Sequence, residues 1–391
     1  MRLPSTIKKR LLFMKKKVVY AVSGEGRGHA GRGLAIARLM QDEIDFYFMC
    51  GGKAHDLIKS TDYNLIELPY LGFVYEKNSI NQFKTLIRNV KLYMNRKEIY
   101  RNIRQKLEEI KPDAVICDFE YFVPRVANKM GIPVIQLSHQ MVLLACRYYV
   151  PVSQWWHFML AYIVTRLIIN KTPYSVGISF FQLPSLEKYK KRNFKLFPPL
   201  IRQHILNKKP SYDGPILVYF SCNTFGWVVD MLKQFTDEKF VVYGIENTAR
   251  TDGNIEYKPI SPITFLDDLV TAKAVITNGG HTLISEAVHL NKPCFAFYVH
   301  GQFEQYLNSY YLHQLNFGRR NTTRKNAMKE ITAFLDEVPS LTEGLKKIDI
   351  CGNDIVTSYL RDIIVKSSAK KTVIANSAVM LSSGYQQANR L

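Results

Sequence analysis

KAVITNGGHTLISEAVHLNKPCFAFYVHGQFEQYLN, residues 273–308, is the stretch that decides the fold. It begins with a short apolar run, Ala274–Ile276, which predicts a buried strand. Gly279 and Gly280 follow, and they allow the backbone to turn sharply and to approach a ligand closely. Thr282 is then placed to cap a helix, because a threonine hydroxyl can accept a hydrogen bond from the first helical turn.

The rest of this stretch completes a strand, turn, helix, strand and loop unit. The helix is expected to end at Asn291–Pro293, before a second buried strand, Cys294–Val299, and a polar loop, His300–Gln305. In a parallel sheet, the turn and the loop fall at the carboxyl edge of the strands, where ligands of open α/β sheets bind. Because the helix amino terminus directs free N–H groups to this edge, a phosphate is the expected ligand.

Composition narrows the class of protein and its partners. The chain has 391 residues, of which 47% are hydrophobic, so two or three domains with ordinary cores are expected. Its net charge of +20 favours an anionic partner, either nucleic acid, an anionic membrane or a phosphorylated substrate. No zinc-finger spacing or RNA-binding aromatic signature accompanies this charge, so we expect no nucleic-acid partner.

Cysteine usage and hydropathy indicate the compartment. None of the six cysteines form a C-x-x-C pair, which is typical of a reduced protein rather than of a disulfide framework. No uncharged apolar stretch reaches the ~20 residues needed to span a bilayer. We therefore expect a cytoplasmic protein, with peripheral attachment to the inner face of the membrane left open.

A second glycine-rich turn lies near the amino terminus. A predicted strand, Val18–Ser23, leads into a loop that contains Gly26, Gly28 and His29. This spacing is similar to a dinucleotide-binding fingerprint, but the acidic residue expected after the next strand, Phe46–Cys50, is missing, so NAD is not expected. His29 is either a catalytic residue or a helix-start residue bonded to a carbonyl.

Three further polar residues are predicted at the same edge. Asp118 and Glu120 follow one predicted strand, and His139 follows the next. Because the carboxyl ends of parallel strands share one edge, these side chains should lie near His29, where one of them could act as a base or orient one. Asp118 could equally cap the helix that follows it.

Two segments predict helices with an unusual distribution of apolar residues. Residues 81–111 carry an apolar face and many cations, so they form either a solvated helix packed on the core or a surface for anionic lipid headgroups. Residues 154–170 are apolar nearly all round but too short to span a membrane. They form either a buried helix or one that lies on a membrane, with Trp155 and Trp156 at the headgroups.

The stretch at residues 273–308 resembles the donor-binding region of GT-B glycosyltransferases. The resemblance rests on Gly279-Gly280, Ser285-Glu286-Ala287 and Gln302–Gln305 with Asn308. Among these enzymes, the stretch is similar to the group that contains the lipid II N-acetylglucosaminyltransferase and the monogalactosyldiacylglycerol synthases. The resemblance implies an α/β fold with two doubly wound Rossmann-like domains facing each other across a cleft. The donor-binding residues that it implies are Asn223, Phe265, Gly279, Gly280, His281, Thr282, Glu286, Gln302, Glu304 and Gln305.

Within that set the resemblance assigns particular roles. Gly279-Gly280 and the helix terminus hold the nucleotide diphosphate, and Glu286 grips the ribose hydroxyls. Glu304 and Gln305 reach the sugar hydroxyls, and the nucleotide base lies near Phe265. Composition predicts a basic lead-in (1–16) and a disordered tail (366–391), and the prolines of 197–200 predict the linker between the domains. The resemblance implies that 17–197 is the acceptor domain and 198–365 the donor domain.

The implied reaction moves a hexose or N-acetylhexosamine from a nucleotide diphosphate sugar to a hydroxyl, with inversion. His29, on the acceptor-facing loop with Gly26 and Gly28, is the preferred base, and Asp118 and Glu120 are the next choices. No cofactor is expected beyond the sugar nucleotide, expected to be UDP-linked, and no metal, because the chain has no Asp-x-Asp pair. The acceptor is expected to be a lipid or another cell-envelope component.

Two other functions are compatible with the sequence. A sugar-nucleotide 2-epimerase would share the two-domain layout and the donor site, and it would need no membrane surface. A non-catalytic sugar-nucleotide-binding membrane protein would bind without turnover, but it would leave the His29 loop without a purpose.

Overall fold

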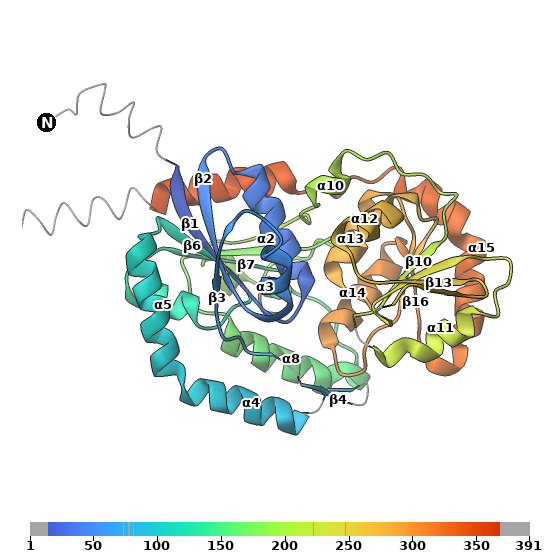
Figure 1. Cartoon of the computed structure of the whole chain (residues 1–391), viewed down its shortest axis with the longest axis horizontal. Coiled ribbons are helices and arrows are strands. Elements are labelled where there is room, and N and C mark those ends of the chain that lie inside the picture. Colours follow the sequence, from blue (N-terminus) through green and yellow to red (C-terminus); the bar gives the residue numbers. More distant parts are fainter. Residues whose placement is uncertain are drawn as a thin grey trace, which may run out of the picture.

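Two seven-stranded sheets form the framework of the chain (Figure 1). This computed structural model describes residues 15–367, apart from residues 73, 77–78, 81, 222 and 247. The predicted lead-in and tail therefore lie almost entirely outside the described residues. A small antiparallel pair, β4 (Tyr75–Glu76) and β5 (Ser79–Ile80), forms a third sheet.

The first sheet is wholly parallel, with the order β3-β2-β1-β6-β7-β8-β9. Alternate residues of its central strand enter different cores, since Val18 and Tyr20 pack in one cluster and Val19 and Ala21 in another. Burial on both faces explains why these strands are continuous apolar runs. The strands are β1 (Lys16–Val22), β2 (Ile44–Cys50), β3 (Asn64–Glu67), β6 (Ala114–Asp118), β7 (Val134–Ser138), β8 (Tyr174–Ile178) and β9 (Phe194–Phe197). The helices of this part are α2 (Arg27–Leu39), α3 (Gly52–Ile58), α4 (Gln82–Met94), α5 (Arg96–Ile110), α6 (Val123–Lys129), α7 (Met141–Ala145), η1 (Val152–Gln154), α8 (Trp155–Ile168) and α9 (Glu187–Lys190). Helix α10 (Gln203–Leu206) follows in the segment that leads into the second domain.

The second sheet has the order β12-β13-β11-β10-β14-β15-β16, and only β12 is antiparallel to its neighbour. The strands are β10 (Ile216–Tyr219), β11 (Phe240–Tyr243), β12 (Arg250–Asp252), β13 (Ile255–Lys258), β14 (Val275–Thr277), β15 (Cys294–Ala296) and β16 (Gly318–Arg320). The helices are η2 (Asn223–Phe225), α11 (Gly226–Leu232), α12 (Pro262–Thr271), α13 (His281–His289), α14 (Phe303–Gln314), η3 (Arg324–Asn326) and α15 (Ala327–Leu345). The predicted fold class, two doubly wound α/β domains, is confirmed.

The strand order reverses direction once in each sheet. In the first sheet the reversal lies between β1 and β6, and in the second it lies between β10 and β14. Loops at such a switch point diverge to opposite faces and leave a crevice that binds ligands. The loops after β1 and β6 carry His29 and Asp118, and the loop after β14 carries Gly279 and Gly280, so the topology brings the predicted site residues to these crevices.

The last described helix, residues 353–367, crosses back to the first domain (Figure 1, red). Its Val356, Leu360 and Ile363 pack in the same cluster as β1 and α2. Arg361 also pairs with Glu43 of the first domain. This differs from the predicted boundary, which placed all of 198–365 in the second domain, because the helix has no sequence signal for which core it joins.

The predicted helix at 81–111 is two helices, α4 and α5, and α4 exposes its apolar face. Phe83 is 72% exposed and Met94 is 70% exposed. The polar side of α4 faces the protein instead, since Thr85 accepts a hydrogen bond from the Val74 N–H (2.9 Å) and Asn89 bonds both backbone groups of Gly72. The alternative of a helix packed on the core through its apolar face is therefore wrong for α4.

Helix α8 also exposes large apolar side chains. Trp155 and Trp156 are 55% and 70% exposed, and the helix has a single buried residue, Thr165. Arg125 ends the helix by donating hydrogen bonds to the carbonyls of Leu167 and Ile168. The alternative of a buried helix is thus wrong. Within the described residues, no helix combines the length and the apolarity that crossing a bilayer requires.

A chain of aromatic contacts joins α4 to α8. Tyr93 of α4 meets Tyr121 edge-on at 6.5 Å between ring centroids. Arg125, which caps α8, lies over the Tyr121 ring at 3.6 Å. Both helices run along the lower side of the molecule in Figure 1. Most of the exposed large apolar side chains of the first domain therefore belong to two helices that are joined by these contacts.

Candidate active site

The two glycine-rich turns meet between the domains. Gly28 lies in the first turn of α2, and a Cβ added to it would stand 2.9 Å from Oγ1 of Thr282 in the second domain. Gly26 is the N-cap of α2, with extended backbone angles. Because Gly28 has no side chain, the helix that carries His29 can lie directly against the start of α13.

His29 is held by a buried carboxylate. Its Nδ1 lies 2.7 Å from Oδ1 of Asp118, whose side chain is completely buried. A carboxylate only accepts hydrogen bonds, so this contact requires a proton on Nδ1 and leaves Nε2 unprotonated in the neutral ring. In this tautomer Nε2 can accept a hydrogen bond from the Gln140 amide nitrogen, which lies 3.4 Å away. The arrangement gives His29 the geometry of a general base.

Arg32 completes this cluster, and sequence reasoning missed it. Its guanidinium donates two hydrogen bonds of 2.8 Å to the two oxygens of Asp118, and Tyr20 approaches the same carboxylate at 3.4 Å. Burial alone would raise the pKa of Asp118, but the charges of Arg32 and His29 hold that pKa below its usual value. Arg32 stands three residues after His29 on α2, a spacing that places both on one helix face.

Glu120, rather than Asp118, caps the next helix. Its two carboxylate oxygens accept hydrogen bonds from the N–H groups of Phe122 (2.8 Å) and Val123 (2.7 Å) at the start of α6. Burial raises the pKa of Glu120 to about 7, although those two N–H groups oppose the rise. The alternative in which Asp118 caps α6 is thus wrong, and the capping bonds occupy both oxygens of Glu120.

Phe119 separates these two carboxylates and has a left-handed backbone. Its φ of 58° is unusual for a bulky residue and redirects the chain after β6. The ring stacks on His29, with 6.1 Å between centroids and 9° between planes. A strained residue that packs on His29 is a further feature of the candidate site that the sequence did not indicate.

The second glycine turn has the conformation that its sequence requires. Gly279 has φ of 78°, and a Cβ there would lie 3.0 Å from the Gln305 carbonyl. Helix α13 begins at His281 with Gly280 as its N-cap, and no side chain caps it. The prediction that Thr282 caps this helix is therefore wrong, because the helix starts one residue before Thr282.

Two histidines stack across the domain boundary at this turn. His139 follows β7 of the first domain, and His281 starts α13 of the second; their ring centroids are 4.0 Å apart. His139 Nε2 lies 2.8 Å from Oδ1 of Asn308, which in turn donates to the Gly279 carbonyl at 3.0 Å. Burial and the charges of His139, Arg32 and His29 lower the pKa of His281 well below its ordinary value.

His281 is buried without a partner. Neither ring nitrogen has a hydrogen-bond partner among the described residues, although the side chain is almost wholly enclosed. A buried polar group without a partner costs free energy, which a ligand can recover. The orphaned ring stands at a helix amino terminus, where free N–H groups favour an anion.

Glu286 forms an ion pair that the sequence did not predict. Arg202, in the segment that connects the domains, donates two hydrogen bonds to its two oxygens. The side chain of Glu286 is completely buried, whereas that of Arg202 is 25% exposed. Glu286 is therefore available to a ribose only when Arg202 moves away.

The polar loop before α14 contacts both domains. Gln302 is the N-cap of α14, and Gln305 accepts a hydrogen bond from the Val299 N–H at 3.0 Å. Glu304 accepts one from Gln140 of the first domain at 2.9 Å. Since Gln140 also approaches His29, a single side chain, that of Gln140, bridges His29 and the predicted sugar-binding carboxylate of Glu304.

Two further predicted donor residues, Asn223 and Phe265, lie on other elements of the second domain. Asn223 begins η2 after β10. Phe265 is a core residue of α12, packed edge-on against Tyr219 and Tyr243 at 5.4 and 5.1 Å. A cavity of about 320 Å³ opens beside it, lined by Lys258, Pro259, Ser261, Thr264, Asp267 and Asp268.

Two Rossmann-like domains with a polar site between their switch points define the GT-B class of glycosyltransferases. The family model of glycosyl transferase family 1 matches residues 16–339. This protein therefore belongs to glycosyl transferase family 1 and is a glycosyltransferase.

Relatives and solved structures agree with this assignment. Uncharacterized glycosyltransferases are 22% identical over 342 residues in Methanosarcina acetivorans (78% of this chain, 85% of that protein) and 23% identical over 392 residues in Methanosarcina mazei (91% and 99%). The structure of LpCGTa in complex with UDP has a TM-score of 0.60 at 13% identity, covering 90% of this chain and 99% of that one. MurG of Acinetobacter baumannii has a TM-score of 0.56 at 13% identity, covering 89% and 100%.

Proposed function

We propose that this protein transfers a hexose or N-acetylhexosamine from a UDP-linked sugar to a hydroxyl of a lipid-linked acceptor, with inversion and without a metal. The observation that carries the proposal is the pairing of His29 with Asp118 beside the Gly279-Gly280 turn. This pairing supplies a base on one domain, and the turn offers a diphosphate site on the other.

In the proposed reaction, His29 Nε2 takes the proton of the acceptor hydroxyl while its oxygen attacks the anomeric carbon. Asp118 stabilises the imidazolium that forms, because its carboxylate already accepts the Nδ1–H bond. General base assistance of this kind contributes about 10²–10⁴-fold to a rate. The bond to the diphosphate breaks on the opposite side of the sugar ring, so the anomeric centre inverts.

On the donor side, the leaving diphosphate would lie at the start of α13. The orphaned His281 and the free N–H groups of that helix would stabilise its charge. The UDP bound to LpCGTa, which shares the fold, supports a nucleotide as the donor. We place the nucleotide base in the cavity beside Phe265, the ribose at Glu286 and the hydroxyls of the transferred sugar at Glu304 and Gln305.

The acceptor class rests on the exposed apolar helices of the first domain. Monomeric proteins seldom expose a large contiguous apolar surface unless it binds a partner or a membrane. Helix α4 carries Lys84, Arg88 and Lys91 beside its apolar face, and each cation near an anionic membrane contributes about 1 kcal/mol. Peripheral binding through α4 and α8 would bring a lipid-linked hydroxyl to the domain that carries His29.

A transfer assay tests this function. Purified protein is incubated with radiolabelled UDP-glucose, UDP-galactose or UDP-N-acetylglucosamine and a lipid extract, and we expect solvent-extractable label with equal release of UDP. The His29→Ala variant is the control. Conversion of the sugar nucleotide without an acceptor would instead establish an epimerase, and tight UDP binding without turnover would contradict an enzymatic role.

A further inference from the structure

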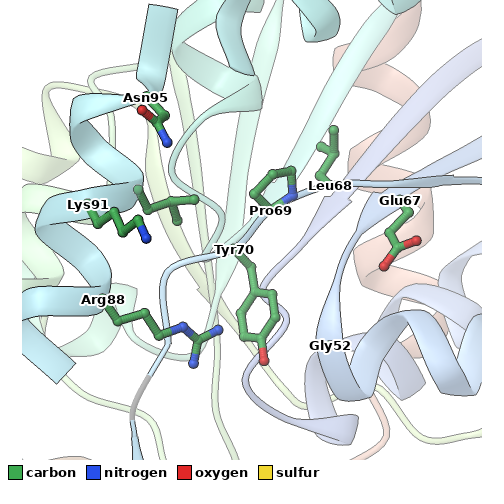
Figure 2. A pocket seen from close by; sticks show the side chains of 9 residues that line it. Gly52, Glu67, Leu68, Pro69, Tyr70, Arg88, Lys91 and Asn95 are labelled. Carbon is green, nitrogen blue, oxygen red and sulfur yellow. The ribbon is translucent and has the colours of Figure 1, made fainter. Parts of the chain in front are cut away.

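A cavity of about 600 Å³ lies in the first domain, between α4 and the chain that follows β3 (Figure 2). Glu67, Leu68, Pro69 and Tyr70 line one side, and the other side is lined by Arg88, Lys91 and Leu92 of α4 and by Asn95, which follows α4, with Gly52 below. Its volume falls in the usual range of ligand pockets, about 300–1,000 Å³. None of the roles proposed above for donor, base or acceptor hydroxyl uses it.

The α4 side of this cavity is cationic. Arg88 and Lys91 point from the helix toward Tyr70, and the Arg88 guanidinium lies 4.8 Å from the Tyr70 ring centroid (Figure 2). Five N–H donors allow a guanidinium to rest on a ring and bind a phosphate at the same time. Glu67 stands on the opposite wall, where its carboxylate suits a hydroxyl and disfavours an anion.

The cavity adjoins the exposed apolar face of α4. Arg88 and Lys91 are three residues apart, so they share one side of α4. Ile87 and Met94, four residues before and three residues after Lys91, are exposed and adjoin Lys91 on the helix surface. A lipid with its chains on that apolar side would have its headgroup beside the two cations.

Tyr70 connects this cavity to the loop that precedes His29. Cβ atoms added to Gly24, Gly51 or Gly72 would stand 2.4, 2.2 and 2.5 Å from their nearest atoms, and the Tyr70 ring is among the close contacts of each. Only glycine therefore fits at these three positions around the Tyr70 ring. A ligand in the cavity would be separated from the Gly24–Gly28 loop by one aromatic side chain.

We propose that this cavity binds the phosphate of an anionic lipid headgroup, with Arg88 and Lys91 as its cationic ligands and Glu67 accepting a headgroup hydroxyl. The proposal rests on the proposed function in one respect, because it assumes that α4 docks on a membrane. The phosphate is held by charge-assisted hydrogen bonds, which are stronger and more directional than attraction to a charged surface.

The test uses a soluble short-chain lipid, dihexanoyl phosphatidylglycerol below its micelle concentration, and calorimetry on the full chain. We expect R88Q/K91Q to weaken binding at least tenfold. The matched control is K97Q/R101Q on the adjacent α5, which removes one lysine and one arginine that do not line the cavity and should change affinity less than twofold. An equal loss of lipid affinity in both double variants would overturn the proposal, because it would show that the lipid is attracted by the general positive charge rather than bound in the cavity.

Two further measurements separate the possible sources of the phosphate and the possible failures. Glycerol 3-phosphate should bind at least tenfold more weakly than the lipid, and equal affinity would overturn the lipid assignment. Flotation with phosphatidylglycerol vesicles tests membrane docking separately, so short-chain binding without flotation would sustain the pocket and refute the docking. K91Q alone changes an exposed residue and should weaken lipid binding about threefold. It replaces the double variant if the double variant unfolds.

Discussion

The ion pair between Arg202 and Glu286 gives the sharpest test of the donor site. Replacing Arg202 by glutamine leaves a completely buried carboxylate without its cation. Removing one partner of a buried ion pair costs about 3–5 kcal/mol. Since 1 kcal/mol shifts the melting temperature of a domain of this size by roughly 2–4 °C, R202Q should melt about 6–20 °C below the wild type.

The affinity for UDP should change in the opposite direction. If Glu286 binds the ribose, the ribose hydroxyls and Arg202 compete for the same two oxygens. In R202Q this competition is absent. A hydrogen bond to a charged group contributes about 1.5–3 kcal/mol, so UDP should bind about tenfold tighter, or more, to a less stable protein.

Thermal unfolding followed by circular dichroism and calorimetry with UDP measure the two effects. R202K is the matched control, because it keeps the charge but cannot form both hydrogen bonds, and both of its changes should be smaller. Glu286→Gln should lose both stability and UDP affinity. If R202Q loses stability while its UDP affinity stays unchanged or falls, Glu286 holds the connecting segment and is no ribose ligand.

Three further predictions concern the base and the membrane surface. His29→Ala should lower turnover ~100-fold or more with nearly unchanged UDP affinity, and a loss confined to UDP binding in calorimetry would show that His29 is a donor ligand. Asp118→Asn should lower turnover and cost about 3 kcal/mol, because it leaves buried Arg32 unpaired. The pKa of Asp118 is lower in the folded protein than its ordinary value of about 3.9. The difference in stability between the wild type and Asp118→Asn should therefore be largest above pH ~3.9 and disappear as the pH falls through the folded pKa. A difference that persists in unfolding curves at about pH 2 would contradict this linkage. Trp155→Ala with Trp156→Ala should reduce the salt-resistant part of vesicle flotation at an unchanged melting temperature, whereas a lower melting temperature with unchanged flotation would give the two rings a packing role.

The location of the site followed from the sequence because it depends on local units. Each strand, glycine turn and helix carries its own signal, and parallel strands place all such turns at one edge. His29, Asp118, Gly279 and Glu304 accordingly lie in one interdomain region. The sequence could not predict the partner of each side chain, since Arg202 and Glu286 are 84 residues apart and no sequence pattern links them.

The wrong predictions share a physical cause. Periodicity identified the apolar face of α4, but not the direction in which it points, which is decided by the hydrogen bonds of Thr85 and Asn89 to a distant loop. In the same way, the sequence indicated Asp118 as a possible cap, whereas the left-handed Phe119 turns the chain so that Glu120 caps the helix. Both outcomes depend on backbone geometry that composition does not record.

The chain crosses between the domains twice, and the ion pair of Arg202 with Glu286 lies at this double crossing. Asn353 bonds both backbone groups of Ile201, at 2.8 and 3.0 Å, and the Gly352 N–H donates to the Pro199 carbonyl at 2.8 Å. A Cβ at position 352 would lie 2.4 Å from the Pro198 carbonyl, so the two segments can approach this closely only with glycine there. Arg202 is the next residue after Ile201, and it precedes α10, whose His204 and Leu206 contact Asp267 and His289 of the second domain. The ion pair of Arg202 with Glu286 therefore fastens the connecting segment to α13, next to the point where the chain crosses between the domains.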